Sequence, residues 1–228
     1  RCSEAAGVAV VTGDTKVVPK GKADGIFVNT TGIGIASHRH SISGTQAQPG
    51  DVVMVSGSLG DHGITIMGCQ AGIAIGGDIA SDTQPLHRLV ATLLEDNSSM
   101  VHVLRDPTRG GLATTLCEIA QASGVSIVIE EECLPIRPSV NTACEMLGLD
   151  PLYLANEGKC IVICEPEAAD DLLRLMRQLP EGTDAAVIGR VEAGRGTGRG
   201  AGRVSLTTRI GGSRLLEPLA GQPLPRIC

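Results

Sequence analysis

Residues 50–63 read GDVVMVSGSLGDHG, which predicts a buried strand followed by a glycine-rich loop. Residues 51–56 form a short apolar run rich in valine, as in strands that are covered on both faces. Gly57, Gly60 and Gly63 end this run, and the apolar residues between 64 and 73 predict a helix. The polar turn that precedes the strand, GTQAQPG at residues 44–50, indicates a domain boundary.

Apolar patterns on both sides of this stretch predict alternating strands and helices. Downstream, strands are predicted at residues 101–104, 125–130, 159–164, 185–188 and 203–208, and helices at residues 84–94, 112–122, 140–147 and 167–178. Asp82 is placed to cap the first of these helices. Upstream, residues 7–18 and 25–31 read as strands. The irregular spacing favours an α+β class with mixed sheets over a doubly wound Rossmann fold.

We therefore predict three segments: a first domain at residues 1–49, an α+β domain at 50–214 and a flexible tail at 215–228. Residues 1–7 resemble the last turns of a helix, so we expect further residues to precede this chain. The Gly/Arg-rich stretch at residues 193–203 is of low complexity and indicates a solvated hairpin loop.

Composition excludes several classes of function. The 228 residues are 42% hydrophobic with a formal net charge of −6, and only Phe27 and Tyr153 are aromatic. A nucleic-acid-binding protein needs a basic surface or aromatic platforms for bases, so we expect neither DNA nor RNA as a partner. No apolar run is long enough to span a bilayer, and we expect no membrane association.

The eight cysteines fall into different settings. Six lie in apolar or helical patterns and are interpreted as small buried hydrophobes of a reducing cytoplasm: Cys69, Cys117, Cys133, Cys144, Cys160 and Cys164. Cys228 instead ends a tail that has no core to bury it. Cys228 could be either a functional thiol or one half of a disulfide bond, and the sequence leaves both open. A stretched tail of this length, counted from Gly212, reaches about 50 Å, so such a thiol can visit a distant site.

Two glycine-containing loops suggest ligand binding. In GDTK at residues 13–16, Asp14 is suited to a hard cation and Lys16 to a phosphate oxygen, although a plain surface turn explains the same residues. In GSLGDHG at residues 57–63, the backbone amides can form an anion site at a helix N-terminus, or Asp61 can simply cap that helix.

Two further loops carry candidate polar groups. Asp106 and Arg109, in DPTRGG at residues 106–111, either bind a ligand or pair with each other. Glu157 lies between apolar segments, where burial can make it a general base. The alternative is a turn residue paired with Lys159.

Six motifs, in this order over nearly the whole chain, resemble those of the HypE family of hydrogenase maturation factors. They are GDTKVVPKG (13–21), NTTGIG (29–34), GDVVMVSGSLGDHG (50–63), RDPTRGGLA (105–113), ANEGK (155–159) and PRIC (225–228). PRIC is the most specific, because related families lack it. HypE proteins are ATP-using members of the aminoimidazole ribonucleotide synthetase-like superfamily, so the resemblance implies that α+β fold, with residues 1–49 as a remnant of an N-terminal ATP-binding domain.

The resemblance also implies a reaction. A carbamoyltransferase, HypF, would load a carbamoyl group onto Cys228, and ATP with Mg²⁺ would drive its dehydration to a thiocyanate. A HypC–HypD complex would then receive the cyanide for the iron of a [NiFe] hydrogenase. Glu157 would be the base, Lys16 would stabilise the phosphate charge, and Asp14 would bind Mg²⁺–ATP. Asp106, Thr108 and Arg109 would line the pocket, and the cytoplasmic protein would be a homodimer.

The front of the chain departs from the family, in which about a hundred residues precede GDTK and include further ligands of Mg²⁺–ATP. Two alternatives therefore remain open. One is a non-catalytic carrier or docking fragment of the same system. The other is a different ATP-using member of the superfamily, related to selenophosphate synthetase or thiamine phosphate kinase, although those chemistries need no C-terminal thiol.

Overall fold

The computed structural model describes residues 1–23, 25–35, 41–72, 79–95, 99–194 and 202–219. The chain divides into two compact units, Arg1–His40 and Ser41–Cys228. Within the described residues, every helix is too short or too polar to cross a lipid bilayer.

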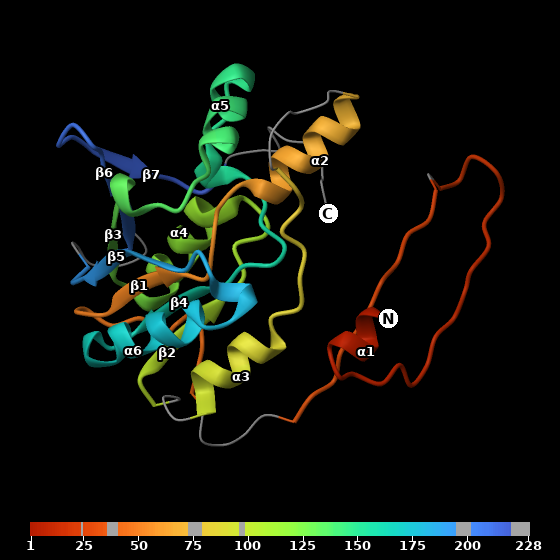
Figure 1. Cartoon of the computed structure of the whole chain (residues 1–228), viewed down its shortest axis with the longest axis horizontal. Helices are drawn as coiled ribbons and strands as arrows, with labels where there is room; N and C mark the ends of the chain where they lie inside the picture. The colour runs from red at the N-terminus through yellow and green to blue at the C-terminus, as the bar shows by residue number, and fades with distance from the viewer. Residues whose placement is uncertain (24, 36–40, 73–78, 96–98, 195–201, 220–228) are drawn as a thin grey trace. The chain divides into compact units, whose positions relative to one another are not determined.

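The unit Arg1–His40 has less regular structure than expected. The predicted helical start is confirmed as α1 (Cys2–Ala5). The strands predicted at residues 7–18 and 25–31 are wrong, since no strand is formed there within the described residues. These stretches follow an open arm (Figure 1). A strand needs a neighbour for its N–H and C=O groups, and the arm has none in its own unit. Val11 and Phe27 are exposed in consequence.

The unit Ser41–Cys228 is built on a seven-stranded mixed sheet with the order β2-β4-β1-β5-β3-β6-β7. The strands are β1 (Val52–Val55), β2 (Val101–Arg105), β3 (Ser126–Glu130), β4 (Ile161–Cys164), β5 (Ala186–Glu192), β6 (Arg203–Thr207) and β7 (Ser213–Leu216). Only the β3–β6 pair is parallel among these strands. The predicted α+β class with a mixed sheet is confirmed.

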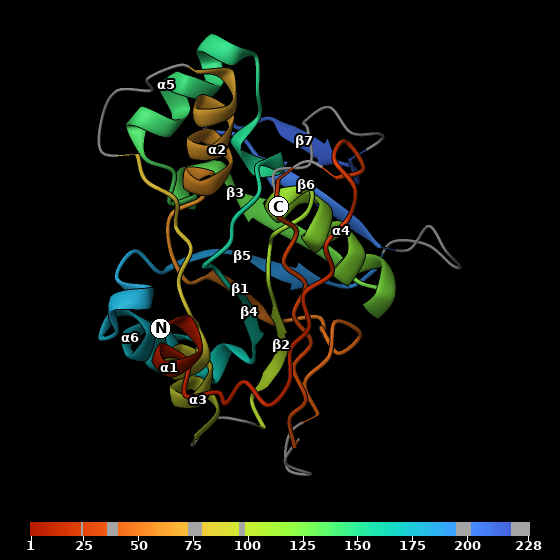
Figure 2. The same ribbon diagram turned by 90° about the vertical axis from the view of Figure 1, so that its right-hand side faces the viewer.

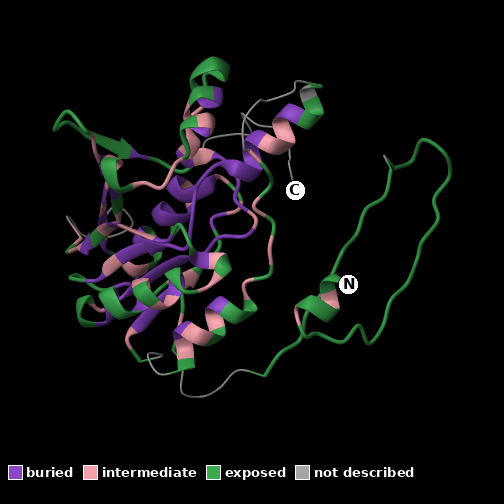
Figure 3. Ribbon diagram, in the orientation of Figure 1, coloured by how far each residue is buried: buried purple, intermediate pink, exposed green. Residues whose placement is uncertain are grey.

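Helix α4 (Gly111–Ser123) covers one face of the sheet, and α3 (His87–Glu95) and α6 (Pro166–Arg177) cover the other. Helices α2 (Asp61–Ala71) and α5 (Pro138–Leu147) pack on each other in a separate apolar cluster. Side chains alternate along a strand, so Val53 and Val55 of β1 pack with α4, whereas Met54 packs with α3 and α6 on the other face. Figure 2 shows α4 on one side of the sheet and α3 and α6 on the other. The buried residues concentrate in the sheet and α4 (Figure 3).

The starts of α2 and α3 each differ from the prediction by three residues. Helix α3 begins at His87, so the predicted start at residue 84 and the cap by Asp82 are both wrong. The side chain of Asp82 is instead only 4% exposed and contacts another loop, described below. The other four helices lie within three residues of their predicted starts. Proline opens α5 and α6, where its missing N–H is not needed.

Burial of the cysteines is also only partly as predicted. Cys117, Cys144, Cys160 and Cys164 are buried, but Cys69 and Cys133 are exposed. Cys133 lies in a short 3₁₀ turn after β3, and Cys69 lies near the end of α2. A sequence pattern identifies an apolar helix face but does not say where that helix projects from the core.

The segment that leads to the C-terminus is attached to the fold as far as residue 219. Leu216 of β7 is buried, and the hydroxyl of Tyr153 donates to the carbonyl of Glu217 at 2.9 Å. The backbone N–H of Leu219 donates to Thr114 Oγ1 at 3.2 Å. The first residues of the predicted tail therefore belong to the described fold, and Cys228 lies outside the described residues.

Candidate functional site

The loop after β1 is shaped by glycines at close contacts. Gly60 has a φ of 84° and precedes the first residue of α2. A Cβ at this position would lie 3.0 Å from Val140, so a larger residue is disfavoured by both backbone and space. Gly57 leaves room for the side chain of Lys159, whose Cε would lie 3.1 Å from a Cβ. The predicted strand, glycine-rich loop and helix are thus confirmed. The side chain of Lys159, which precedes β4, packs against Gly57 of the loop.

Asn156 joins three of the four polar loops that the sequence singled out. Its Oδ1 accepts the N–H of Gly60 at 2.8 Å, and its Nδ2 donates to the carbonyl of Pro107 at 3.1 Å. Nδ2 also donates to the carbonyl of Leu154 at 3.0 Å. Asn156 is fully enclosed, so these bonds are shielded from water. The loops at residues 57–63, 106–111 and 155–159 therefore meet at one amide side chain.

Residues 79–84, which we name the strap, lie against the loop that carries Glu157. Asp82 Oδ1 accepts the backbone N–H of Glu157 at 3.0 Å, and Asp82 Oδ2 lies 3.5 Å from Lys159 Nζ. The pairing of Glu157 with Lys159 considered from the sequence is therefore wrong, because Lys159 pairs with Asp82. Glu157 Oε1 is buried and has no hydrogen-bond partner among the described residues.

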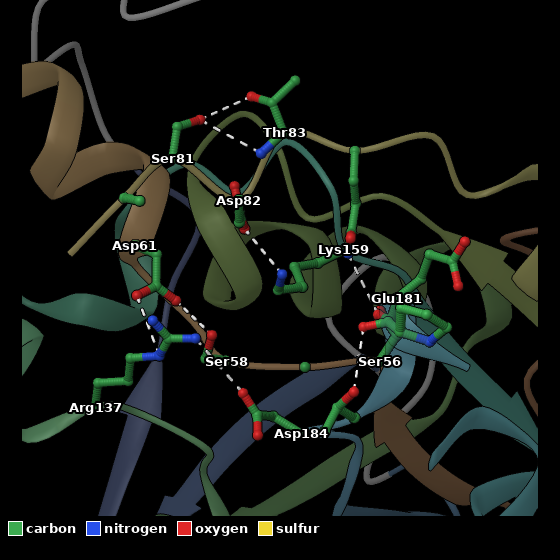
Figure 4. A pocket seen from close by; sticks show the side chains of 15 residues that line it. Ser56, Ser58, Asp61, Ser81, Asp82, Thr83, Arg137, Lys159, Glu181 and Asp184 are labelled. Atoms are coloured by element: carbon green, nitrogen blue, oxygen red, sulfur yellow. Dashed lines mark hydrogen bonds and ion pairs between the residues drawn. The ribbon is translucent and has the colours of Figure 1, made fainter. Parts of the chain in front are cut away.

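A pocket of about 250 Å³ lies between the strap, the loop after β1 and the start of α5 (Figure 4). Its charged lining consists of Asp61, Asp82, Glu181, Asp184, Lys159 and Arg137. Four carboxylates therefore face two cations. A free phosphate would meet an excess of negative charge, which disfavours the anion site proposed for residues 57–63.

Asp61 takes the place that an anion would occupy at the start of α2. Its Oδ2 accepts the hydroxyl of Ser58 at 2.5 Å, and its Oδ1 lies 3.6 Å from Nε of Arg137. Arg137 also lies 3.6 Å from Asp184 through its Nη2. A carboxylate in the first turn is stabilised by the helix dipole, so Asp61 acts on α2 without being the capping residue itself, which is Gly60.

The other predicted site residues are distributed over both units. In the 106–111 loop, Thr108 Oγ1 donates to Asp106 Oδ2 at 2.7 Å, so Asp106 pairs with Thr108 and not with Arg109, which is exposed. Asp14 and Lys16 are exposed in the unit Arg1–His40, where Asp14 Oδ1 accepts the N–H of Thr15 at 2.8 Å.

Sequence reasoning missed Asn156 and assigned Asp82 and Lys159 to other partners. A signal for Asn156 was present, since an amide between apolar segments needs buried hydrogen-bond partners. Asp82 offered no such signal, because it is 75 residues away from Glu157 in sequence. Its polar neighbours Ser81 and Thr83 fit an ordinary helix start equally well.

The fold and the joined loops define the class of protein. Residues 48–201 match the family described as AIR synthase related protein, C-terminal domain. This match covers more than half of the chain, so the protein belongs to that family.

Within this class, the chain is similar to HypE proteins. The chain is 51% identical over 223 residues to "Carbamoyl dehydratase HypE" of Azotobacter vinelandii, which is 98% of this chain and 64% of that protein. A solved hydrogenase maturation protein HypE in complex with ATP is 48% identical, with a TM-score of 0.92, over 100% of this chain and 67% of that one. A HypE–HypF complex matches at 41% identity and a TM-score of 0.71, over 77% of this chain and 55% of that one. The chain belongs to the HypE family and spans about 64% of the curated relatives' length.

Proposed function

We propose that this protein acts in [NiFe] hydrogenase maturation, by ATP-dependent dehydration of a carbamoyl group on Cys228 to a thiocyanate. The observation that carries the proposal is the 51% identity, over 98% of the chain, to a protein named carbamoyl dehydratase. The cyanide formed in this way becomes a ligand of the hydrogenase iron.

The reaction needs the carbamoyl oxygen to become a leaving group. In the proposed first step, the oxygen of Cys228–S–C(=O)–NH₂ attacks the γ-phosphate of ATP, and loss of one N–H proton gives Cys228–S–C(=NH)–O–phosphate and ADP. In the second step, the remaining N–H proton leaves, the C–O bond breaks, and thiocyanate and inorganic phosphate form. ATP thus takes up the oxygen, and a base must accept two protons.

Glu157 is the proposed base. Its Oε1 is buried and makes no hydrogen bond among the described residues, so this oxygen is free to accept a proton. The backbone of Glu157 is held by Asp82, and its neighbour Asn156 is held by two other loops. This arrangement meets the requirement for a base whose position is established before the substrate arrives.

The proposed nucleotide contacts are taken from the family motifs. We assign Lys16 to the developing phosphate charge, and Asp106, Thr108 and Arg109 to the lining of the site. Mg²⁺ supplies charge neutralisation on the phosphates when bound. We assign Asp14 to Mg²⁺, an ion that proteins commonly bind through one or two carboxylates, with its other ligands from phosphates and water.

The proposed partners follow the order of the reaction. A HypF carbamoyltransferase loads Cys228, and a HypC–HypD complex accepts the cyanide. We also propose a homodimer, supported by the exposed apolar side chains of the Arg1–His40 arm, which water solvates poorly. A cytoplasmic location is part of the proposal, because a free tail thiol needs a reducing compartment.

Mass spectrometry of the C-terminal peptide tests the proposal. The protein is incubated with HypF, carbamoyl phosphate and ATP, and we expect Cys228 to gain one carbamoyl group and then to lose the mass of one water in an ATP-dependent step. Carbamoylation without water loss would identify a carrier and contradict the dehydratase. An unmodified Cys228 would contradict both and favour another ATP-using member of the superfamily.

A further inference from the structure

We propose that Asp82 is the positioning residue for Glu157, the base in the proposed reaction. This inference rests on the proposed function, and it adds a residue that lies outside all six family motifs quoted above. Asp82 does not touch the reacting atoms. It acts through the backbone of Glu157 and through the ammonium group of Lys159.

The two carboxylate oxygens of Asp82 contact the two residues that flank Gly158. Oδ1 accepts the N–H of Glu157 at 3.0 Å, and Oδ2 lies 3.5 Å from Nζ of Lys159. The side chains of both Asp82 and Lys159 are more than nine-tenths buried, so a carboxylate held between an amide and an ammonium group is little screened by water. One side chain therefore restrains the residues on both sides of Gly158.

The backbone of the strap lies in close contact with Gly158 of the Glu157 loop. A Cβ on Gly158 would lie 1.9 Å from the carbonyl oxygen of Asp82 and 2.8 Å from the backbone N of Gln84. Gln84 Nε2 donates to the carbonyl of Gly158 at 3.0 Å. The strap and the Glu157 loop thus share three polar contacts and one close backbone contact.

The strap is itself anchored on its other sides. Ser81 Oγ lies 2.9 Å from Nδ1 of His62, a residue of α2, and Gln84 Nε2 donates to the carbonyl of Glu181 at 3.3 Å. Figure 4 shows Ser81, Asp82 and Thr83 on the strap above Lys159 and Glu181. The strap is therefore fixed to α2 and to the turn at Glu181, and Asp82 connects it to the loop that carries Glu157.

In the described part of the chain, the carboxylate of Glu157 lacks side-chain partners, so its position depends on the restraint of the Glu157 backbone by Asp82. This carboxylate makes no hydrogen bond or ion pair among the described residues. A base without side-chain partners depends on its backbone for direction, and a displacement of about 1 Å can cost about 100-fold in rate. The hydrogen bond from the backbone N–H of Glu157 to Asp82 therefore orients the Glu157 side chain.

A matched pair of double variants isolates this restraint. Removing Asp82 alone would leave the Lys159 ammonium buried and unpaired, so Lys159→Met is combined with each change. Asp82→Asn/Lys159→Met keeps an oxygen that accepts the Glu157 N–H, whereas Asp82→Ala/Lys159→Met does not. Both double variants lack the charges of Asp82 and Lys159. Any difference between them therefore reports the hydrogen-bond acceptor at position 82.

The first measurement is independent of activity. Amide hydrogen exchange at Glu157 should be about fivefold faster, or more, in the alanine variant than in the asparagine variant, as expected for loss of one hydrogen bond. Equal exchange rates at Glu157 in two folded variants would overturn the inference, whatever the fate of the proposed reaction.

The second measurement is the single-turnover rate of water loss from carbamoylated Cys228. We expect the alanine variant to be about 10- to 100-fold slower than the asparagine variant, with the KM for ATP and the loading by HypF unchanged. Equal rates, in a protein that performs the reaction, would overturn the inference and leave the proposed function intact. Wild-type protein without water loss would contradict the proposed function, while the exchange measurement would still decide on Asp82.

Discussion

Asn156 shows how much of the site depends on one side chain. Its amide satisfies a backbone N–H of the loop before α2 and a carbonyl of the loop before α4, both of them away from solvent. A buried polar group that loses its partner costs about 1–3 kcal/mol. Neither a shorter nor a purely accepting side chain can replace both bonds.

Asn156→Ala should therefore lower the free energy of unfolding by about 2–4 kcal/mol, because the N–H of Gly60 and the carbonyl of Leu154 lose this partner. The carbonyl of Pro107 keeps the backbone N–H of residue 156 at 3.3 Å. Denaturant unfolding followed by circular dichroism measures this loss. Asn141→Ala on α5 is the matched control, since the Asn141 side chain has no hydrogen bond among the described residues, and its unfolding midpoint should stay close to that of the wild type. Similar losses in the two variants would contradict the role assigned to Asn156.

Glu157→Gln should abolish the ATP-dependent loss of water from carbamoylated Cys228, because an amide does not accept the N–H protons. Loading of Cys228 by HypF should continue, since it does not use this base. The two steps are separated by mass spectrometry of the C-terminal peptide. Glu167→Gln, an exposed change in the first turn of α6, should lose water normally. Dehydration that survives in Glu157→Gln would show that another group is the base.

The buried cysteines should not compete with Cys228 in labelling experiments. Burial raises the pKa of Cys160 and of Cys164 to about 12, and the pKa of Cys117 and of Cys144 to about 11. Only the thiolate is nucleophilic, so iodoacetamide at pH 8 should leave these four unlabelled in the folded protein. Exposed Cys2, Cys69 and Cys133 should react. Peptide mapping checks the pattern, and rapid labelling of Cys160 would contradict the burial.

The same thiols make the fold sensitive to strong alkali. In the unfolded chain they ionise near the ordinary pKa of 9.0, whereas Cys160 and Cys164 keep their protons in the fold to about pH 12. A raised folded pKa means that this contribution is complete below pH 9 and is lost as the pH rises from 9 to 12. Cys160→Ala/Cys164→Ala should accordingly show a weaker decline of unfolding free energy across this range.

At the scale of elements, the helices on the α3–α6 face could be predicted well from the sequence. Leu172 and Met176 lie one turn apart on α6, and Leu89 and Leu93 have the same spacing on α3. That spacing places each pair on one face of a helix, and the structure buries all four side chains. Helix α3 nevertheless begins three residues later than predicted, because the residues before it belong to the strap.

Leu172→Ala should lower the free energy of unfolding by about 2–5 kcal/mol, since it opens a cavity in the cluster between α6 and the sheet. Thermal and denaturant unfolding measure the change. The control is Asp170→Ala on the exposed side of the same helix, which should change stability by about 0.5 kcal/mol or less. A small effect at Leu172 would contradict the packing of α6 described above.

At the scale of the whole molecule, the two units differ in how far each buries its own apolar side chains. The unit Ser41–Cys228 has a covered sheet with a core on each face. The arm of Arg1–His40 exposes valine, isoleucine and phenylalanine side chains along its described length. Large exposed apolar patches commonly mark interaction sites, and this exposure supports the homodimer that the family resemblance implies.

Val11→Asp/Phe27→Asp should therefore convert the proposed dimer to a monomer, because charges placed in an apolar interface must be desolvated. Light scattering after gel filtration measures the mass. Lys20→Asp/Lys22→Asp, also exposed on the arm, is the control for added negative charge and should remain dimeric. A wild-type protein that is monomeric at high concentration, or a double variant that stays dimeric, would contradict the proposal.

The local pattern of the sequence was sufficient for the α+β class, the strand before the glycine-rich loop, most helices and the four polar motifs. These features depend on the period of apolar residues and on turn residues that are neighbours in the chain. The partners of Asp82, Asn156 and Lys159 were decided only by the tertiary structure, because their contacts join loops about 50 to 100 residues apart. The absence of strands in the described part of the arm has a similar cause, since an extended segment becomes a strand only when another segment satisfies its backbone.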